Sequence, residues 1–216
     1  MSGTGCDIVA LKAINVARSQ QSRFYSKIIT DVEKSFYDKA LSAIMPLEHF
    51  VWLAWSVKES VYKFLQRGKP DLVFSPSKMV IQQLKVPASA SSLTGGRGFD
   101  SDTVYKGLVM FDGRQFHSAS VITGDFIFSA VNDSDDFTGI HWAVKKIGSS
   151  EPDVQSAEVR RLISGTLPDL FPRQDLRIEK SPHGYPFVSS GDKELPVIVS
   201  FAHHDHWIAY SFVLNN

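Results

Sequence analysis

The chain of 216 residues has almost no cysteine and no excess of charge of either sign. Its single cysteine, Cys6, excludes an internal disulfide and is typical of a reducing compartment. Lys and Arg number 23, as do Asp and Glu, so the formal net charge is zero. There is no overall basic field to attract nucleic acid, and any anionic ligand must be bound by a local cluster of cations.

Long apolar runs are missing as well. No stretch approaches the roughly 20 apolar residues that a membrane-spanning helix needs, so we expect no membrane partner. The opening MSGTGCDIV lacks the basic and apolar regions of a signal peptide, which predicts a cytoplasmic protein. The composition, 43% hydrophobic and 21% charged, is ordinary for a globular protein with one sizeable core or two small ones.

Hydrophobic periodicity predicts the main helices. Thr30 and Glu33 have the spacing of a capping box, so a helix is expected to begin there. The strongest helix is predicted at residues 46–67, and a third at residues 154–167. In the strongest helix, apolar residues recur at steps of three and four: Phe50, Ala54, Val57, Val61 and Phe64.

Short apolar segments predict an antiparallel β component with a weak internal repeat. Residues 87–101, rich in Ser and Gly, are expected to form a loop. The segments 126–131 and 207–212 are alike, and each follows a short polar turn. This similarity indicates two similar α+β halves. The alternative is that any two antiparallel meanders share this pattern. The polar run 132–136 is typical of a boundary between such halves. Strands are expected at residues 5–10, 79–86, 104–111, 115–121, 126–131, 140–144, 176–179, 197–201 and 207–213.

The predicted helix at residues 46–67 carries a charged cluster. Glu59 and Lys63 are four residues apart and share one face, with Lys58 about 100° round the helix. An exposed ion pair would explain this spacing. However, Trp55 and Tyr62 lie on the same side, so the face is not simply a solvated one.

Two other segments carry candidate site residues. Asp7 lies in an apolar strand, where it needs a compensating cation or donor unless it caps a turn at the strand edge. His203, His204 and His206 invite a zinc interpretation, but no matching Cys or His pair occurs elsewhere. A polar hairpin turn and a phosphate-binding histidine remain as alternatives.

Together these segments resemble the 4′-phosphopantetheinyl transferase superfamily. Residues 5–7 (Gly-Cys-Asp) and 55–63 (WSVKESVYK) look like its Gly-x-Asp and Lys-Glu motifs. Residues 183–186 (His-Gly-Tyr-Pro) and 199–203 (Val-Ser-Phe-Ala-His) are similar to its Gly-Lys-Pro and Ser-His motifs. Arg160 lies in a segment like the arginine-bearing helix of the family. The resemblance covers most of the chain.

The order of these motifs is exchanged relative to the two-domain, surfactin-type branch. The resemblance therefore implies a circularly permuted α+β pseudo-dimer of two similar halves. Residues 1–131 would form the metal-binding half and residues 137–216 the coenzyme A-binding half. Because both sides of the cleft come from one chain, we expect a monomer with one site.

The resemblance also implies an activity and residue roles. The enzyme would transfer the 4′-phosphopantetheine group from coenzyme A to a serine of an apo acyl or peptidyl carrier protein. Asp7 and Glu59 would hold Mg²⁺, and Glu59, or a water that it orients, would take the proton from the serine. Lys63 and Lys58 would neutralise charge on the phosphates. The coenzyme would also be bound by Arg160, Gly184, Tyr185, Pro186 and His203.

Three positions depart from the two-domain branch. Val9 stands where that branch has a further carboxylate, so the metal motif is more like the holo-acyl-carrier-protein synthase type. Ala202 and Tyr185 replace the motif Ser and Lys, which leaves open a non-catalytic relative that binds coenzyme A or a carrier protein without turnover. The basic residues that usually grip the 3′-phosphate have little counterpart, and the candidates to replace them are Lys145, Lys146 and Lys180.

Overall fold

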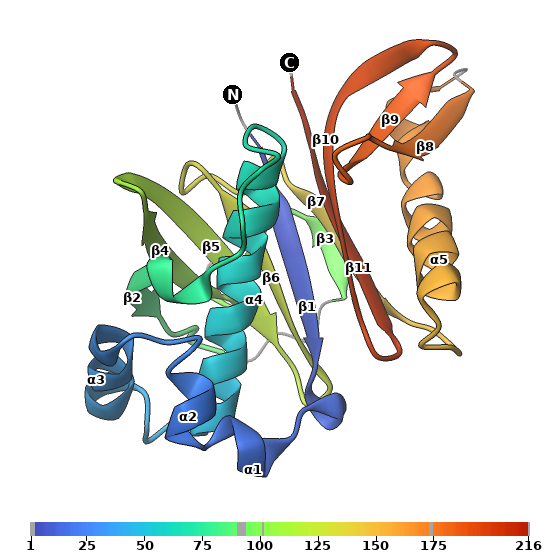
Figure 1. Ribbon diagram of the computed structural model, residues 1–216. Coiled ribbons are helices and arrows are strands. Elements are labelled where there is room, and N and C mark those ends of the chain that lie inside the picture. The colour runs from blue at the N-terminus through green and yellow to red at the C-terminus, as the bar shows by residue number, and fades with distance from the viewer. Residues whose placement is uncertain (1–2, 90–93, 101, 173–174, 216) are drawn as a thin grey trace.

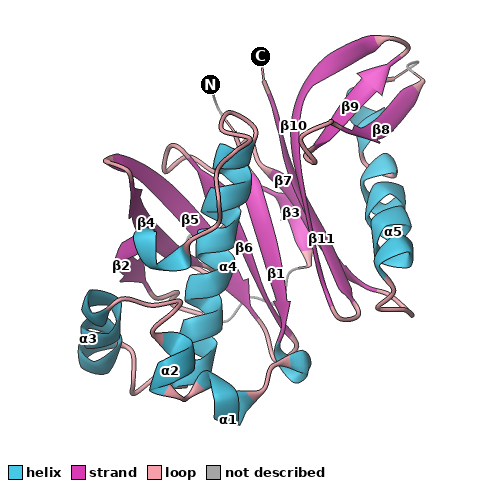
Figure 2. Cartoon of the chain, in the orientation of Figure 1, coloured by secondary structure: helices cyan, strands magenta, loops and turns pink. Residues whose placement is uncertain are grey.

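The computed structural model describes residues 3–89, 94–100, 102–172 and 175–215. Two antiparallel sheets lie side by side, and each carries a long helix on its outer side (Figure 1). None of the helices described combines the length and apolar character that crossing a membrane requires. The mixture of helices and antiparallel strands confirms the expected α+β class (Figure 2).

The first sheet contains five strands and is covered by helix α4, Leu47–Gln66. Three shorter helices, α1 (Val16–Ser19), α2 (Ser22–Tyr25) and α3 (Asp31–Ala40), connect β1 to α4 together with a 3₁₀ turn at Leu11–Ala13. A second 3₁₀ turn, Pro76–Lys78, precedes β2. Across the sheet the strands run β1 (Gly5–Ala10), β6 (Phe126–Asn132), β5 (Arg114–Ile122), β4 (Tyr105–Phe111) and β2 (Val80–Lys85).

The second sheet contains six strands, with helices α5 (Pro152–Ser164) and α6 (Leu167–Leu170) between its strands β7 and β8. The sequence pattern misses β9 and begins β10 four residues late. Across the sheet the strands run β3 (Gly95–Arg97), β7 (His141–Lys146), β11 (Trp207–Leu214), β10 (Lys193–His204), β9 (Pro186–Ser190) and β8 (Leu176–Lys180).

The strand order supports the internal repeat. In the first half, β1 is followed by α4 and the sheet runs β1-β6-β5-β4-β2; in the second, β7 is followed by α5 and the sheet runs β7-β11-β10-β9-β8. Each half therefore places its first strand beside its last.

The prediction of a loop at residues 87–101 is wrong in part, because Gly95–Arg97 forms strand β3 on the edge of the second sheet. Residues 90–93 and 101 of that segment lie outside the described residues.

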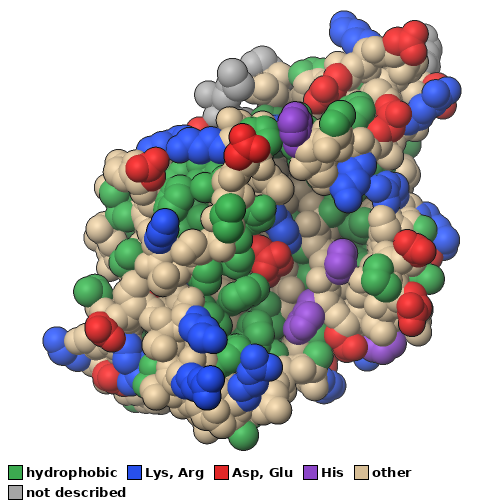
Figure 3. Space-filling model, viewed as in Figure 1, with side chains coloured by type: hydrophobic (Ala, Val, Ile, Leu, Met, Phe, Trp, Pro, Cys, Tyr) green, Lys and Arg blue, Asp and Glu red, His purple; other side chains and the backbone are tan. Residues whose placement is uncertain are grey.

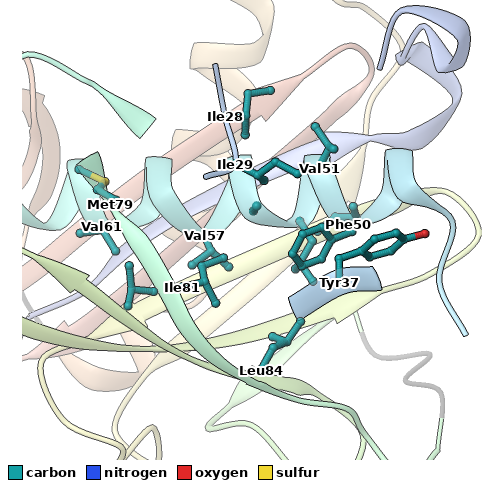
Figure 4. Packing of buried hydrophobic residues seen from close by; sticks show 14 of the residues in the cluster. Ile28, Ile29, Tyr37, Phe50, Val51, Val57, Val61, Met79, Ile81 and Leu84 are labelled. Atoms are coloured by element: carbon teal, nitrogen blue, oxygen red, sulfur yellow. The ribbon is translucent and has the colours of Figure 1, made fainter. Parts of the chain in front are cut away.

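Helix α4 is the main packing element of the first half. Its apolar face is fully buried at Phe50, Val57 and Val61 and packs on the sheet and on α3, as Figure 4 shows. Burying a side chain of this size stabilises the fold by about 1.5–3 kcal/mol. The spacing of those residues therefore fixes which face of α4 meets the sheet and which face stays free for Glu59 and Lys63.

Candidate functional site

Three charged side chains meet where β1 lies against α4. The Lys63 Nζ atom is 3.0 Å from Oδ1 of Asp7 and 3.2 Å from Oε1 of Glu59. Glu59 and Lys63 share a face of α4, as their spacing predicts, and β1 supplies Asp7 from a site 56 residues away in the sequence. The structure thus brings together two carboxylates and one ammonium group that the sequence places on separate elements.

The charges in this cluster do not balance. One ammonium group faces two carboxylates, and Oδ2 of Asp7 is buried without a hydrogen-bond partner among the described residues. The pKa of Asp7 is raised to about 7, because burial raises it strongly, Lys63 lowers it in part and Glu59 raises it. Burial alone would lower the pKa of Lys63, but the carboxylates of Asp7 and Glu59 raise it overall. The cluster can therefore accept a proton or a further cation.

A cavity of about 300 Å³, here called the carboxylate cavity, opens beside this cluster. Both halves contribute to it, because the histidines come from β10 and the other groups from β1 and α4. Figure 3 shows acidic, histidine and basic groups around a groove between the halves. The polar and aromatic side chains lining the cavity are Asp7, Glu59, Trp52, Trp55, His203 and His204.

A second cavity of about 220 Å³ adjoins the first and is here called the cationic cavity. His203 lines both cavities, and Lys63 lines the second while bonding the carboxylates of the first. Among the residues that the structure describes, no Asp or Glu lines the cationic cavity, although the chain as a whole has no net charge. Such a local concentration of cations is suited to an anionic ligand. The side chains that give it this character are Lys63, Arg67, Arg160, Lys180 and His203.

The two histidines at the end of β10 have different surroundings. Burial lowers the pKa of His203, and the nearby Lys63 lowers it further. Burial also lowers the pKa of His204, whose Nδ1 atom accepts a hydrogen bond of 2.8 Å from the backbone N–H of Ala10. Because an accepting Nδ1 carries no proton, neutral His204 holds its proton on Nε2. The described residues contain no group of three or more His, Cys, Asp and Glu side chains placed to hold a metal ion.

The coenzyme-site residues expected from the resemblance are mostly brought together. Arg160 on α5, His203 on β10 and the turn formed by Gly184, Tyr185 and Pro186 all line the cationic cavity. Gly184 adopts a φ of +93°, which glycine accommodates more easily than other residues. The second half thus gathers these five positions, spread over 44 residues, around one cavity.

Lys58 is the exception, because it lines neither cavity. Its side chain is fully buried and its Nζ atom donates to Oε2 of Glu33 at 2.8 Å and to the carbonyl of Ile28 at 2.6 Å. Glu33 also accepts from the backbone N–H of Ile81. The expectation of a coenzyme-binding Lys58 is therefore replaced by a structural role that ties α4 to the segment around α3 and to β2.

Arg67 and His204 line the cavities but belong to none of the motifs that carry the resemblance. Arg67 lines the cationic cavity and His204 the carboxylate cavity. The continued four-residue step from Glu59 through Lys63 to Arg67 is a signal that could reveal Arg67, since such residues share a helix face. Val9 and Ala202, two of the positions that differ from the two-domain branch, are both buried, with 2% and 1% of their surfaces exposed.

Comparisons with known proteins give one match. Searches of curated proteins and of solved structures return no significant match. Residues 3–106 match the family model described as the 4′-phosphopantetheinyl transferase superfamily. The matched segment includes Asp7, Glu59 and Lys63, the three residues whose charged groups meet between β1 and α4. This segment, just under half of the chain, is thus similar to the 4′-phosphopantetheinyl transferase superfamily.

Proposed function

We propose that this protein transfers the 4′-phosphopantetheine group from coenzyme A to a serine of an apo acyl or peptidyl carrier protein. The supporting observation is that the cationic cavity, which is lined by no carboxylate of the described residues, adjoins the Asp7–Glu59 pair at Lys63 and His203. Residues 1–131 would supply the metal-binding side and residues 137–216 most of the coenzyme-binding side.

The cationic cavity suits the phosphates of coenzyme A. Arg160 and His203 face it from the second half and Lys63 from the first, so the diphosphate would be held between the two. Charge-assisted hydrogen bonds of Lys and Arg to phosphate are about twice as strong as neutral ones. We infer that the diphosphate lies at the Lys63 end, next to the carboxylates.

Asp7 and Glu59 fit a magnesium ion. Mg²⁺ is usually bound by one or two carboxylates together with substrate phosphates and water, and the buried Oδ2 of Asp7 has no other partner among the described groups. When bound there, Mg²⁺ would neutralise the charge that develops on the phosphate oxygens. The pKa of Asp7 near 7 also fits a carboxyl group whose ionised form needs a further cation.

The residues around the carboxylates have complementary roles in the transfer. Glu59 would accept the proton of the carrier serine as the serine oxygen bonds to the β-phosphorus. The phosphoanhydride bond breaks, and adenosine 3′,5′-bisphosphate leaves with its charge stabilised by Lys63 and Arg160. No covalent enzyme intermediate is required, because positioning and charge stabilisation supply the catalysis.

The carrier protein would approach over α1 and α2. The segment 11–29 contains four cations and no Asp or Glu, and it lies beside the Trp52 and Trp55 side of the carboxylate cavity. The Nε1 atom of Trp52 donates to Ser19 at 2.9 Å, which joins this segment to α4. Figure 3 shows basic groups gathered there below the apolar groove. Such a surface is complementary to a partner with acidic residues near its serine. The four cations are Lys12, Arg18, Arg23 and Lys27.

The test is to incubate the protein with coenzyme A, Mg²⁺ and a panel of apo carrier proteins and to read the products by intact mass. We expect one carrier serine to gain a phosphopantetheine group, and chelation of the metal to prevent it. Binding of coenzyme A with no mass change on any carrier would instead identify a non-catalytic relative.

A further inference from the structure

His204, the last residue of β10, is held beside the last residue of β1. Its Nδ1 atom accepts the hydrogen bond of 2.8 Å from the backbone N–H of Ala10, and Oγ of Ser200 accepts one of 2.9 Å from the backbone N–H of Cys6. The two partners are four residues apart on each strand, so these bonds bracket Asp7 and fix the register of β10 against β1. The ring of His204 is thereby placed relative to Asp7.

An aromatic contact holds the same ring from the side of α4. The ring centres of His204 and Trp52 are 6.4 Å apart, and their planes are 26° from parallel. The Nε1 atom of Trp52 is itself bonded to Ser19, which restrains the indole. Trp52 and Glu59 are seven residues apart, about two turns, so they share one face of α4. The imidazole is therefore fixed on the side of the helix that carries Glu59, and both groups line the carboxylate cavity.

This arrangement makes His204 a hydrogen-bond donor rather than a base. Burial lowers the pKa of His204, even though Asp205 and Glu59 raise it, so the ring is neutral at pH 7. Because Nδ1 accepts from Ala10, the proton is on Nε2, and neither nitrogen has a lone pair free to take a further proton. With Nδ1 turned toward β1, the Nε2–H group is the part of the ring left to meet a ligand in the carboxylate cavity.

We propose that the Nε2–H group of His204 donates a hydrogen bond to the hydroxyl oxygen of the carrier serine and so places that oxygen for attack. This inference rests on the proposed function and adds to it a residue that touches the nucleophile. A serine hydroxyl has one proton to donate and two lone pairs. The proton would go to Glu59, one lone pair would accept from His204, and the other would bond to the β-phosphorus. His204 keeps its own proton throughout.

The contribution of His204 is to place the serine and not to activate it. A hydrogen bond accepted by the oxygen draws electron density from it, so its nucleophilicity must come from proton removal by Glu59. Holding the reacting atoms in line lowers the barrier separately, and small misplacements reduce the rate strongly. The effect should concern the carrier and not coenzyme A, because His204 is not among the described residues that line the cationic cavity.

Two amide substitutions separate this role from a structural one. In His204→Asn the amide oxygen lies near the position of Nδ1 and can still accept from Ala10, but the Nε2 donor is lost. In His204→Gln the amide nitrogen lies near the position of Nε2 and keeps the donor, but the bond to Ala10 is lost. With an apo carrier protein that the wild type modifies, His204→Asn should lower kcat/KM for the carrier by about 10- to 100-fold, the range for a hydrogen bond to an oxygen that gains charge. His204→Gln should retain most of the activity.

A binding experiment provides a readout without turnover. In the absence of coenzyme A, the wild type should bind the apo carrier more tightly than a carrier whose serine is replaced by alanine, and His204→Asn should remove that difference. Titration calorimetry measures these affinities, and it should also show that His204→Asn binds coenzyme A with Mg²⁺ as the wild type does. His206→Asn, in the same turn but outside the described linings of both cavities, is the control and should match the wild type throughout.

The outcomes separate this inference from the proposed function. If His204→Asn transfers as fast as the wild type, or if the Asn and Gln variants are equally impaired, His204 does not donate to the serine, even when the wild type modifies the carrier. Weaker binding of coenzyme A by His204→Asn would place the donor on a phosphate and would equally overturn the assignment. A wild type that modifies no carrier would contradict the proposed function itself, and this inference with it.

Discussion

Gly5 of β1 lies so close to Ser60 of α4 that a Cβ atom on Gly5 would be 2.1 Å from the Ser60 carbonyl oxygen. The same atom would be 2.6 Å from the backbone nitrogen of Phe64. Only a glycine allows strand and helix to approach this closely, and the approach brings Asp7 within 3.0 Å of Lys63. The glycine of the Gly-x-Asp motif therefore sets the position of the aspartate.

Gly5→Ala should separate β1 from α4, because backbone atoms cannot move aside as a flexible side chain does. We expect a loss of about 1–3 kcal/mol in the free energy of unfolding, as for other overpacked cores, together with loss of activity. Urea unfolding and the transfer assay measure the two effects. Gly124→Ala is the matched control, since a Cβ there meets nothing within 4 Å. Unchanged stability and activity in Gly5→Ala would contradict this account.

The raised pKa of Asp7 predicts a pH-dependent stability. Its folded pKa of about 7 exceeds the ordinary value of 3.8, so its contribution to stability is fully present below pH 4 and is lost as the pH rises through 7. In metal-free buffer, Asp7→Asn should therefore gain stability relative to the wild type between pH 4 and pH 8, by on the order of a few kcal/mol. Chemical unfolding at several pH values tests this, with the exposed Asp38→Asn as control. A difference between Asp7→Asn and wild type that does not vary with pH would disprove the assignment.

Glu59→Gln should abolish transfer and leave the fold intact. The substitution preserves volume but removes the proposed metal ligand and base, and losing such a group commonly costs 10²–10³-fold in rate. Steady-state kinetics measures the loss, and circular dichroism verifies folding. Glu48→Gln, on the same helix but in neither the carboxylate nor the cationic cavity, should keep wild-type activity. Normal turnover in Glu59→Gln would remove Glu59 from the mechanism.

Metal and coenzyme should bind cooperatively. In the proposed site Asp7 and Glu59 would supply two carboxylates, and Mg²⁺ would take its remaining oxygens from water and the coenzyme phosphates. Coenzyme A should therefore raise the affinity for Mg²⁺, and Mg²⁺ should raise that for coenzyme A by the same factor. Calorimetric titrations of each ligand in the absence and presence of the other measure this factor. Equal affinities would mean that the diphosphate does not lie beside Asp7 and Glu59.

The basic segment 11–29 predicts a charge-sensitive interaction with the carrier. Arg23→Glu should raise the KM for the carrier protein several-fold, because it places a carboxylate where an acidic partner is expected, and should leave the affinity for coenzyme A unchanged. The effect should weaken at high salt, where exposed charges are screened. Lys39→Glu, an equal charge change on α3, is the control. Equal KM values for the two variants would place the carrier elsewhere.

The sequence by itself determines the elements that carry the proposed catalytic groups. The apolar period of α4 and the four-residue step from Glu59 to Lys63 fix one shared face, and the lone Asp7 in an apolar strand indicates a buried charge that needs a partner. These features are local, since residue spacing along a helix or strand decides which side chains point together. The strand order of the structure likewise supports the two halves that the segments 126–131 and 207–212 indicate.

Tertiary structure alone decides which charges meet and which do not. Lys58, next to Glu59 in the sequence, turns into the core and pairs with Glu33, whereas Lys63 reaches Asp7. Arg67 lines the cationic cavity, where carbonyl groups of Pro186 and Val199, more than 100 residues away, hold its side chain. Such contacts depend on how two sheets pack, and no spacing along the chain encodes the distance between them.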